Sequence, residues 1–346
     1  MKSRVCRLYG KNDLKVEQDE VHLPKRGQVL VRLAYGGICG SDMHYLADGG
    51  IGTIKVQEPI ILGHEASGRI IKVGDSVDGL EPEDVVAINP SRPCSLCKFC
   101  TEGLFMHCLE MRFNGSAIRL PHQQGLFRDL MVLEASQCIR VPPDTDLAAL
   151  ACSEPLAVCL HAAKMAGTLS GKRVLITGAG PIGALCTAVA AKSGADTIIV
   201  TDIYDNTLKI AKEMGATECI NVALHPDRME RYTENKGYFD TAFECSAVSS
   251  AIKTAVDTLL PRGCLIQVGV AGDTPVPINA IVAKEIKFQG IHRFHEEFNV
   301  AVRAITNNNV DVRPILSGVF ELKDIEKAFS IAMDRSKSVK VQLKFN

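Results

Sequence analysis

The sequence predicts an α/β protein of two domains, a mostly β domain followed by a doubly wound parallel sheet. Three observations support this fold class. The chain has 346 residues, which exceeds the usual limit for a single hydrophobic core. Residues 1–90 contain short β-type runs separated by frequent turns. From about residue 171 strand and helix patterns alternate, which is typical of a parallel sheet.

The composition is that of a globular protein and excludes several function classes. Hydrophobic residues make up 46% of the chain, enough for two packed cores. A formal net charge of −1 provides no basic surface for nucleic acid or an anionic membrane. We expect no membrane span, because no run of 18 apolar residues occurs, and no signal peptide, because the first ten residues lack an apolar core. The thirteen cysteines are therefore expected to be reduced thiols and metal ligands in the cytoplasm.

The N-terminal part is expected to contain strands at residues 28–35 and 66–73 and a third from residue 84. This succession of short strands and turns, without helix patterns between them, favours a barrel-like β domain.

Two short segments in this domain contain the residues that we expect to bind a catalytic metal. Cys39, His64 and Glu65 offer a thiolate, an imidazole and a carboxylate, the ligand types that zinc accepts in catalytic sites. Ser41 and His44 follow Cys39 closely and can pass a proton outward. Tight turns and close approach of the backbone to a ligand are expected at the glycines of these segments, residues 36, 37, 40 and 63.

A polar loop further along contains four cysteines that can enclose a structural zinc, namely Cys94, Cys97, Cys100 and Cys108. An iron–sulfur cluster is the main alternative. The bacterial ferredoxin pattern has three residues before the fourth cysteine and a proline after it, whereas here seven residues intervene and Leu109 follows. A reduced apolar core fits poorly because the loop is polar.

A helix interrupted near Pro155 is expected over residues 147–159. Glu154 lies among apolar residues there, and an ionised carboxylate in such surroundings needs a cation or a hydrogen-bond partner. The alternative is an acidic residue at a helix end that faces solvent.

Residues 172–202 have the complete context of a dinucleotide-binding turn: strand, glycine-rich turn, helix, and second strand ending in an acid. The turn residues expected at the cofactor are Gly178, Gly180, Pro181, Ile182 and Gly183. Asp202 is expected to accept hydrogen bonds from the adenosine ribose. Ile203 and Tyr204 supply no cation for a 2′-phosphate, so NAD is favoured over NADP.

The alternation continues with helices at 209–214 and 251–260 and strands at 238–245, 263–270 and 285–290. The last strand but one ends in Val268, Gly269 and Val270, where a nicotinamide is expected because ligands collect beyond the carboxyl ends of such strands. The final helices, at 297–307 and 323–333, and a strand at 338–344 are expected to return to the first domain.

In this order the motifs resemble the zinc-dependent medium-chain alcohol and polyol dehydrogenases. The resemblance covers essentially the whole chain and rests on five segments: Gly37-Ile-Cys-Gly-Ser-Asp, Gly63-His-Glu, the four-cysteine loop, Glu154-Pro-Leu and Gly178-Ala-Gly-Pro-Ile-Gly. Tyr45 and residues 290–298 are similar to the sorbitol and L-idonate dehydrogenase branch.

The resemblance implies a GroES-like catalytic domain at residues 1–156 and 295–346 and a Rossmann domain at 157–294, assembled as homodimers or homotetramers. It implies a catalytic zinc at Cys39 and His64, with Glu65 and Glu154 binding the metal directly or through water. Ser41 and His44 occupy proton-relay positions, and Tyr45 and Arg293 polyol-contacting ones. Thr207 departs from the pattern, since sorbitol dehydrogenases have an arginine near the ribose there; Lys209 is a candidate replacement.

The resulting hypothesis is hydride transfer to NAD from a sugar acid, L-idonate to 5-keto-D-gluconate. Arg293 suits a carboxylate, and the flanking His292 and His295 suggest a cationic pocket edge. The alternatives are a neutral substrate, sorbitol or xylitol, and a role for Arg293 in an ion pair between domains.

Two hypotheses come from other classes. A zinc-stabilised scaffold or nucleic-acid module would use the loop at 94–108 and predicts a basic face, which the net charge argues against. A metal-free NAD-binding protein would not need Cys39 and His64 together. Two zinc ions per chain would indicate the enzyme, one the scaffold and none the metal-free protein.

Overall fold

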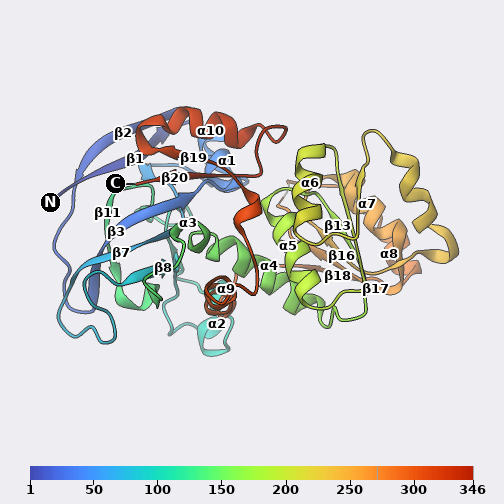
Figure 1. Cartoon of the computed structure of the whole chain (residues 1–346), viewed down its shortest axis with the longest axis horizontal. Coiled ribbons are helices and arrows are strands. Elements are labelled where there is room, and N and C mark those ends of the chain that lie inside the picture. The colour runs from blue at the N-terminus through green and yellow to red at the C-terminus, as the bar shows by residue number, and fades with distance from the viewer. Residues whose placement is uncertain (271, 346) are drawn as a thin grey trace.

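The computed structural model describes residues 1–270 and 272–345. Two lobes lie next to each other, and both chain termini belong to the lobe built from the N-terminal strands (Figure 1). Helix α4 (Ser153–Ala166) runs between the two lobes (Figure 1), and helix α9 (Glu297–Thr306) packs against it.

The first lobe is built on a seven-stranded sheet with the order β12-β8-β7-β3-β20-β19, in which β11 also pairs with β3. Its strands are β3 (Gln28–Gly37), β7 (Glu65–Val73), β8 (Val85–Ile88), β11 (Leu130–Glu134), β12 (Cys138–Val141), β19 (Leu316–Glu321) and β20 (Lys340–Lys344). A smaller sheet contains β2 (Asp13–Glu20), β1 (Lys2–Gly10) and β6 (Ile60–Ile61). Buried side chains such as Leu33, Phe127 and Phe329 fill the space between these elements.

Short elements complete this lobe. They are β4 (Gly50–Ile51) paired with β5 (Ile54–Lys55), β9 (Ser91–Arg92) paired with β10 (Arg112–Phe113), α2 (Lys98–Thr101), η1 (Phe105–His107), η2 (Ala135–Gln137), α3 (Leu147–Leu150), η5 (Arg313–Ile315), η6 (Leu322–Asp324) and α10 (Ile325–Met333).

Helix α1 (Gly40–Asp48) was not among the expected elements, because the glycines around it predicted turns. The helix begins where the Asp42 carboxylate accepts a hydrogen bond from the backbone N–H of Cys39 (3.0 Å). It ends at Gly49, which adopts the left-handed conformation (φ 66°) typical of a helix C-terminus.

The second lobe contains a six-stranded, fully parallel sheet with the order β15-β14-β13-β16-β17-β18. Its elements are β13 (Arg173–Thr177), α5 (Pro181–Lys192), β14 (Thr197–Asp202), α6 (Asp205–Glu213), β15 (Glu218–Asn221), η3 (Pro226–Tyr232), η4 (Glu234–Lys236), β16 (Phe239–Glu244), α7 (Ser249–Thr258), β17 (Leu259–Gln267), α8 (Ile278–Ala283) and β18 (Lys287–Gly290). This strand order confirms the doubly wound fold. It places the reversal of direction, where such sheets bind ligands, between β13 and β16.

The helix expected over residues 147–159 is divided before Pro155 rather than at it. α3 ends at Leu150 and α4 begins at Ser153, so Pro155 lies in the first turn of α4. Proline is tolerated there because first-turn N–H groups have no partner within the helix.

The C-terminal residues return to the first lobe. β19 and β20 join its sheet, as expected, and α9 packs against α4, α3 and β12. Phe298 and Val302 of α9 lie in a core that both lobes share, together with Val85 of β8 and Val174 of β13. The domain boundary expected at residue 156 falls within α4. The expected division into residues 1–156 with 295–346 and residues 157–294 therefore stays a prediction. Among the described residues, no helix has the length and apolarity needed to cross a bilayer.

Candidate active site

Cys39, His64 and Glu65 form a cluster at one edge of the first lobe. One ligand atom of each, a sulfur, an imidazole nitrogen or a carboxylate oxygen, lies within 4.8 Å of the others. Cys39 precedes α1, and His64 and Glu65 lie at the start of β7. The three donors match the ligand set of a catalytic zinc and can hold one ion.

Asp42 organises this cluster and was missed by the sequence analysis. Its carboxylate is fully buried and accepts hydrogen bonds from the backbone N–H groups of Cys39 (3.0 Å) and Gly63 (3.1 Å). It thereby joins the two segments that supply the donors. Burial alone would lower the pKa of His64, but the charges of Asp42 and Cys39 raise it well above its ordinary value. The helix start at Gly40, with an acid two residues later, was the available signal.

Lys340 is a second missed residue. Its Nζ lies 2.6 Å from Oε1 and 2.5 Å from Oε2 of Glu65, and it donates to the Ile38 carbonyl at 3.2 Å. Both side chains are almost completely buried, at 2% and 1% exposure. Burial alone would lower the pKa of Lys340, but the Glu65 carboxylate raises it, so the ion pair remains charged.

Glu154 lies near the cluster without belonging to it. It is buried, and burial raises its pKa to about 7, against the opposing charge of His64. The buried setting confirms that it is not a solvent-facing residue at a helix end. Its role as a zinc ligand stays a prediction, because the group of mutually close ligand atoms contains only the other three residues.

Ser41 and His44 lie on the first turns of α1, three residues apart and therefore on one helix face. Ser41 is half-buried and His44 is exposed, with its Nδ1 2.9 Å from Oδ2 of Asp48. Their role as a proton relay stays a prediction.

Tyr45 and Arg293 are the two residues expected to contact the substrate, and they lie close enough to interact electrostatically. The Tyr45 hydroxyl is buried and accepts a hydrogen bond from the backbone N–H of Ala117 (3.1 Å), which leaves its proton free to be donated. The Arg293 guanidinium lies 4.1 Å from the ring centroid of Phe113, and that ring lies 5.6 Å from the His64 ring. Arg293 forms no ion pair within the part of the chain that the structure describes, which argues against an ion pair between domains.

The two histidines that were expected to add positive charge beside Arg293 do not do so. Loss of solvation and the charge of Arg293 lower the pKa of His292 to about 4, and loss of solvation also lowers the pKa of His295. Both imidazoles are therefore neutral near pH 7, and the positive charge comes from Arg293.

The four cysteines of the polar loop converge as expected. The sulfurs of Cys94, Cys97, Cys100 and Cys108 all lie within 4.8 Å of one another, which fits a closed tetrahedral zinc site. Backbone N–H groups point at the sulfurs, for example from Cys94 to Cys108 Sγ at 3.1 Å. Such hydrogen bonds lower the pKa of Cys97 to about 6, which favours the thiolate form that binds metal.

The glycine turn between β13 and α5 is open where a dinucleotide needs space. A Cβ on Gly180 would meet nothing within 4 Å, whereas one on Gly183 would lie 1.8 Å from the Gly178 carbonyl oxygen. Pro181 and Ile182 begin α5 directly after Gly180, and the unpaired N–H groups of a helix N-terminus favour an anion such as a pyrophosphate. Asp202, at the end of β14, accepts from the backbone N–H of Ala179 (2.6 Å), so the acid adjoins the turn.

The residues expected beside the nicotinamide lie at the carboxyl end of a strand, and their contact with a cofactor stays a prediction. Val268, Gly269 and Val270 follow β17 directly, and Val270 is 77% exposed. Thr207 is buried and donates to the Tyr204 carbonyl at 2.8 Å, so it does not project towards a ribose.

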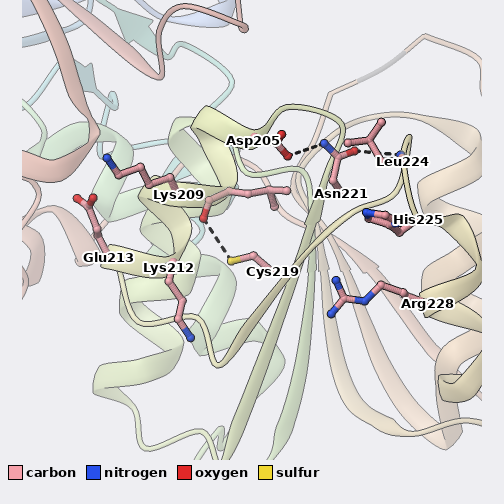
Figure 2. Close-up of a pocket in the computed structure, with 10 residues that line it drawn as sticks. Asp205, Lys209, Lys212, Glu213, Cys219, Asn221, Leu224, His225 and Arg228 are labelled. Carbon is pink, nitrogen blue, oxygen red and sulfur yellow. Dashed lines mark hydrogen bonds between the residues drawn. The ribbon is translucent and has the colours of Figure 1, made fainter.

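Lys209 lines a separate groove of about 610 Å³ between α6 and the segment that follows β15 (Figure 2). Figure 2 shows Lys209 and Lys212 on one wall and His225 and Arg228 on the other. None of the groove residues belongs to the cysteine clusters or the glycine turn. The groove begins at Asp205, three residues after Asp202, and compensation for Thr207 by Lys209 stays a prediction.

Comparisons with known proteins agree with this geometry. An alcohol dehydrogenase GroES-like domain matches residues 25–143, and a zinc-binding dehydrogenase domain matches residues 181–307. The L-idonate 5-dehydrogenase (NAD(P)(+)) of Escherichia coli K12 is 39% identical over 346 residues, covering 100% of this chain and 99% of that protein. The crystal structure of the E. coli L-idonate 5-dehydrogenase matches with a TM-score of 0.96, again covering 100% of this chain and 99% of that chain. A probable D-xylulose reductase A of Neosartorya fischeri is 34% identical over 330 residues, covering 93% of this chain and 91% of that protein.

Proposed function

Since this chain belongs to the zinc-binding dehydrogenases with a GroES-like domain, we propose that it oxidises L-idonate to 5-keto-D-gluconate with NAD. The observation that supports an acidic substrate is the guanidinium of Arg293, stacked on Phe113 beside the metal-ligand cluster. A planar guanidinium binds a carboxylate through two parallel hydrogen bonds. The 39% identity to the E. coli L-idonate 5-dehydrogenase supports the same substrate.

The side chains of the cluster have complementary roles in this reaction. Zinc, held by Cys39 and His64 with Glu65 or Glu154, would lower the pKa of the substrate hydroxyl. Ser41 would accept the proton of that hydroxyl and His44 would pass it to solvent. Arg293 and Tyr45 would orient the substrate, so that the reacting carbon faces the cofactor.

NAD is the proposed cofactor in preference to NADP. Asp202 lies beside the glycine turn, where its negative charge would repel a 2′-phosphate, and Ile203 and Tyr204 supply no cation to offset it. Comparing kcat/KM for the two cofactors tests this choice. A higher kcat/KM with NADP would contradict it.

Replacement of Arg293 tests the substrate. Arg293→Ala should lower kcat/KM for L-idonate by about tenfold or more, since hydrogen bonds to charged groups contribute roughly 1.5–3 kcal/mol. The value for sorbitol should change much less. Arg303→Ala, an exposed change on α9, is the matched control. Equal losses on both substrates, or none, would defeat the carboxylate contact.

A neutral polyol is the second candidate substrate. It is favoured by the 34% identity to a probable D-xylulose reductase and by the ability of a guanidinium to bind hydroxyl groups. A screen of L-idonate, xylitol and sorbitol with the unmodified protein decides between the two. Faster turnover of xylitol or sorbitol would replace the first proposal with this one.

We further propose that the enzyme is a homodimer or homotetramer in the cytoplasm. β18 is an edge strand of the parallel sheet, and exposed apolar side chains lie on and near it: Ile278 (58%), Val282 (69%) and Phe288 (40%). Such a surface is typical of an interface between copies. Light scattering on Val282→Asp should show a smaller particle than the unmodified protein.

The thirteen cysteines form no disulfide, which supports a reducing compartment.

A further inference from the structure

The loop with four cysteines extends to the segment that carries Arg293. We define the cysteine lobe as residues 94–113. It has a small core of its own, in which Cys100, Cys108, Met111 and Phe113 are buried and Phe105 packs against them. Two of these side chains, Phe105 and Phe113, also contact residues beyond the lobe.

Three ring contacts join the cysteine lobe to three of the four residues of the segment 292–295. The Phe105 ring stacks on the His295 imidazole, with centroids 3.9 Å apart and planes inclined by 22°. The Phe113 ring lies beneath the Arg293 guanidinium at 4.1 Å. His107 and His292 form a looser stack at 6.0 Å. The cysteine lobe therefore lies against one side of residues 292–295.

The opposite side of the segment is held by buried groups. Phe294 is buried in the core that both lobes share, and the backbone N–H of His295 donates to the Glu297 carboxylate at 3.0 Å. Between these anchors Arg293 adopts a positive φ of 54°, which is unfavourable for a residue other than glycine. Such a conformation persists only where its surroundings impose it.

We propose that the cysteine lobe positions Arg293, so that closure of the four thiolates around a metal sets the recognition of the substrate. A closed metal site would fix Phe105 and Phe113 relative to each other, because both rings belong to the core that the four sulfurs complete. Phe105 then holds His295, and Phe113 holds the guanidinium. This inference rests on the proposed contact between Arg293 and the substrate. The tests below distinguish a failure of that contact from a failure of the cysteine lobe to position Arg293.

The first test observes the docking of the lobe without measuring activity. The chain has no tryptophan, so Phe105→Trp creates a single fluorescent reporter at the stack. Adding His295→Ala, or removing metal with a chelator, should shift its emission to longer wavelength as the ring becomes exposed. Unchanged emission after both treatments would overturn the proposal.

The second test separates substrate binding from catalysis. Phe105→Leu should raise KM for L-idonate by about tenfold, as expected for a misplaced binding group, while kcat and KM for NAD stay within about twofold. Phe105→Tyr, which keeps the stack, should restore KM. Phe99→Leu is the matched control, because Phe99 lies in the same lobe and its ring contacts His107 and Lys98 rather than residues 292–295.

The outcomes distinguish the two proposals. If Arg293→Ala raises KM but Phe105→Leu does not, the lobe does not position Arg293. If Arg293→Ala leaves KM unchanged, the carboxylate contact is wrong, and the emission of Phe105→Trp still decides whether the lobe holds the segment.

Discussion

Gly37 shows at the residue scale how a missing side chain makes room for a charged pair. In the registers of the sheet it lies opposite Glu65 of β7 and Gln342 of β20. A Cβ on Gly37 would lie 2.0 Å from Glu65 Oε2 and 3.0 Å from Lys340 Cε. The glycine is therefore needed for space within a strand and not for a turn. Of the four glycines expected to turn the chain here, Gly63 alone has a positive φ, 93°.

Lys340→Met should destabilise the metal-depleted protein. The change leaves the Glu65 carboxylate buried without its cation, and breaking a buried pair in this way costs about 3–5 kcal/mol. Urea unfolding measures the loss. Lys344→Met, at the exposed end of the same strand, should change stability by no more than about 0.5 kcal/mol. Equal midpoints for the two variants would contradict an essential ion pair.

Cys39→Ser should abolish turnover and reduce the zinc content from about two ions per chain to about one, because only the site with an open position loses a ligand. The circular dichroism spectrum should remain that of the unmodified protein. Zinc is counted by atomic emission. Retained activity would refute a catalytic role for this thiolate.

At the scale of elements, the glycine turn between β13 and α5 contains two glycines with opposite purposes. Gly183 packs against the carbonyl of Gly178, so it serves folding, whereas Gly180 faces open space, where we expect the dinucleotide. The pattern of glycines predicts both positions, but only the tertiary structure separates their roles.

Gly180→Val should leave the stability nearly unchanged and weaken NAD binding by about tenfold or more, because the side chain would occupy the space that the pyrophosphate needs. Gly183→Ala should instead destabilise the fold by about 1–3 kcal/mol through overpacking. Isothermal titration with NAD and thermal unfolding measure the two effects. A stable Gly180→Val variant with normal NAD affinity would exclude the turn as the cofactor site.

At the scale of the whole molecule, α4 and α9 connect the two lobes, and Glu297 is the buried acid between these helices. Its Oε1 lies 3.3 Å from His161 Nδ1 and 3.1 Å from Lys164 Nζ, both on α4. Burial alone would raise the pKa of Glu297, but hydrogen bonds from His161, the His295 backbone and Lys164 hold it well below its ordinary value of 4.5. The unfolded chain therefore binds the proton more readily.

This difference makes the stability contributed by Glu297 pH-dependent. A depressed pKa stabilises the folded state above pH 4.5, and this contribution decreases as the pH falls below that value. Glu297→Gln should therefore cost about 2 kcal/mol at pH 7 and progressively less in acid, measured by urea unfolding at several pH values. Glu296→Gln, whose side chain is 80% exposed, is the control. A loss that is independent of pH would show that the charge of Glu297 is not responsible.

Local sequence was sufficient for the features that depend on residue type and short spacing. The four cysteines at 94–108, the glycine turn with Asp202, and the donors Cys39, His64 and Glu65 were all predicted, and the structure brings each set together. The order of these motifs was also enough to identify the family. Each motif is formed by neighbours in the chain or by residue types that one metal or cofactor requires.

Only the tertiary structure decided which other groups reach the site. Along β20 the apolar residues Val341 and Leu343 alternate with Lys340 and Gln342, a pattern that predicts a solvent-facing lysine. Lys340 is buried because the other face of β20 is also covered, as the hydrogen bond from Gln342 to the Ala148 carbonyl shows. Likewise, the neutral state of His292 and His295 depends on packing against a lobe almost two hundred residues earlier in the chain. Burial and charge at these positions are set by contacts between distant segments, which the local sequence pattern does not contain.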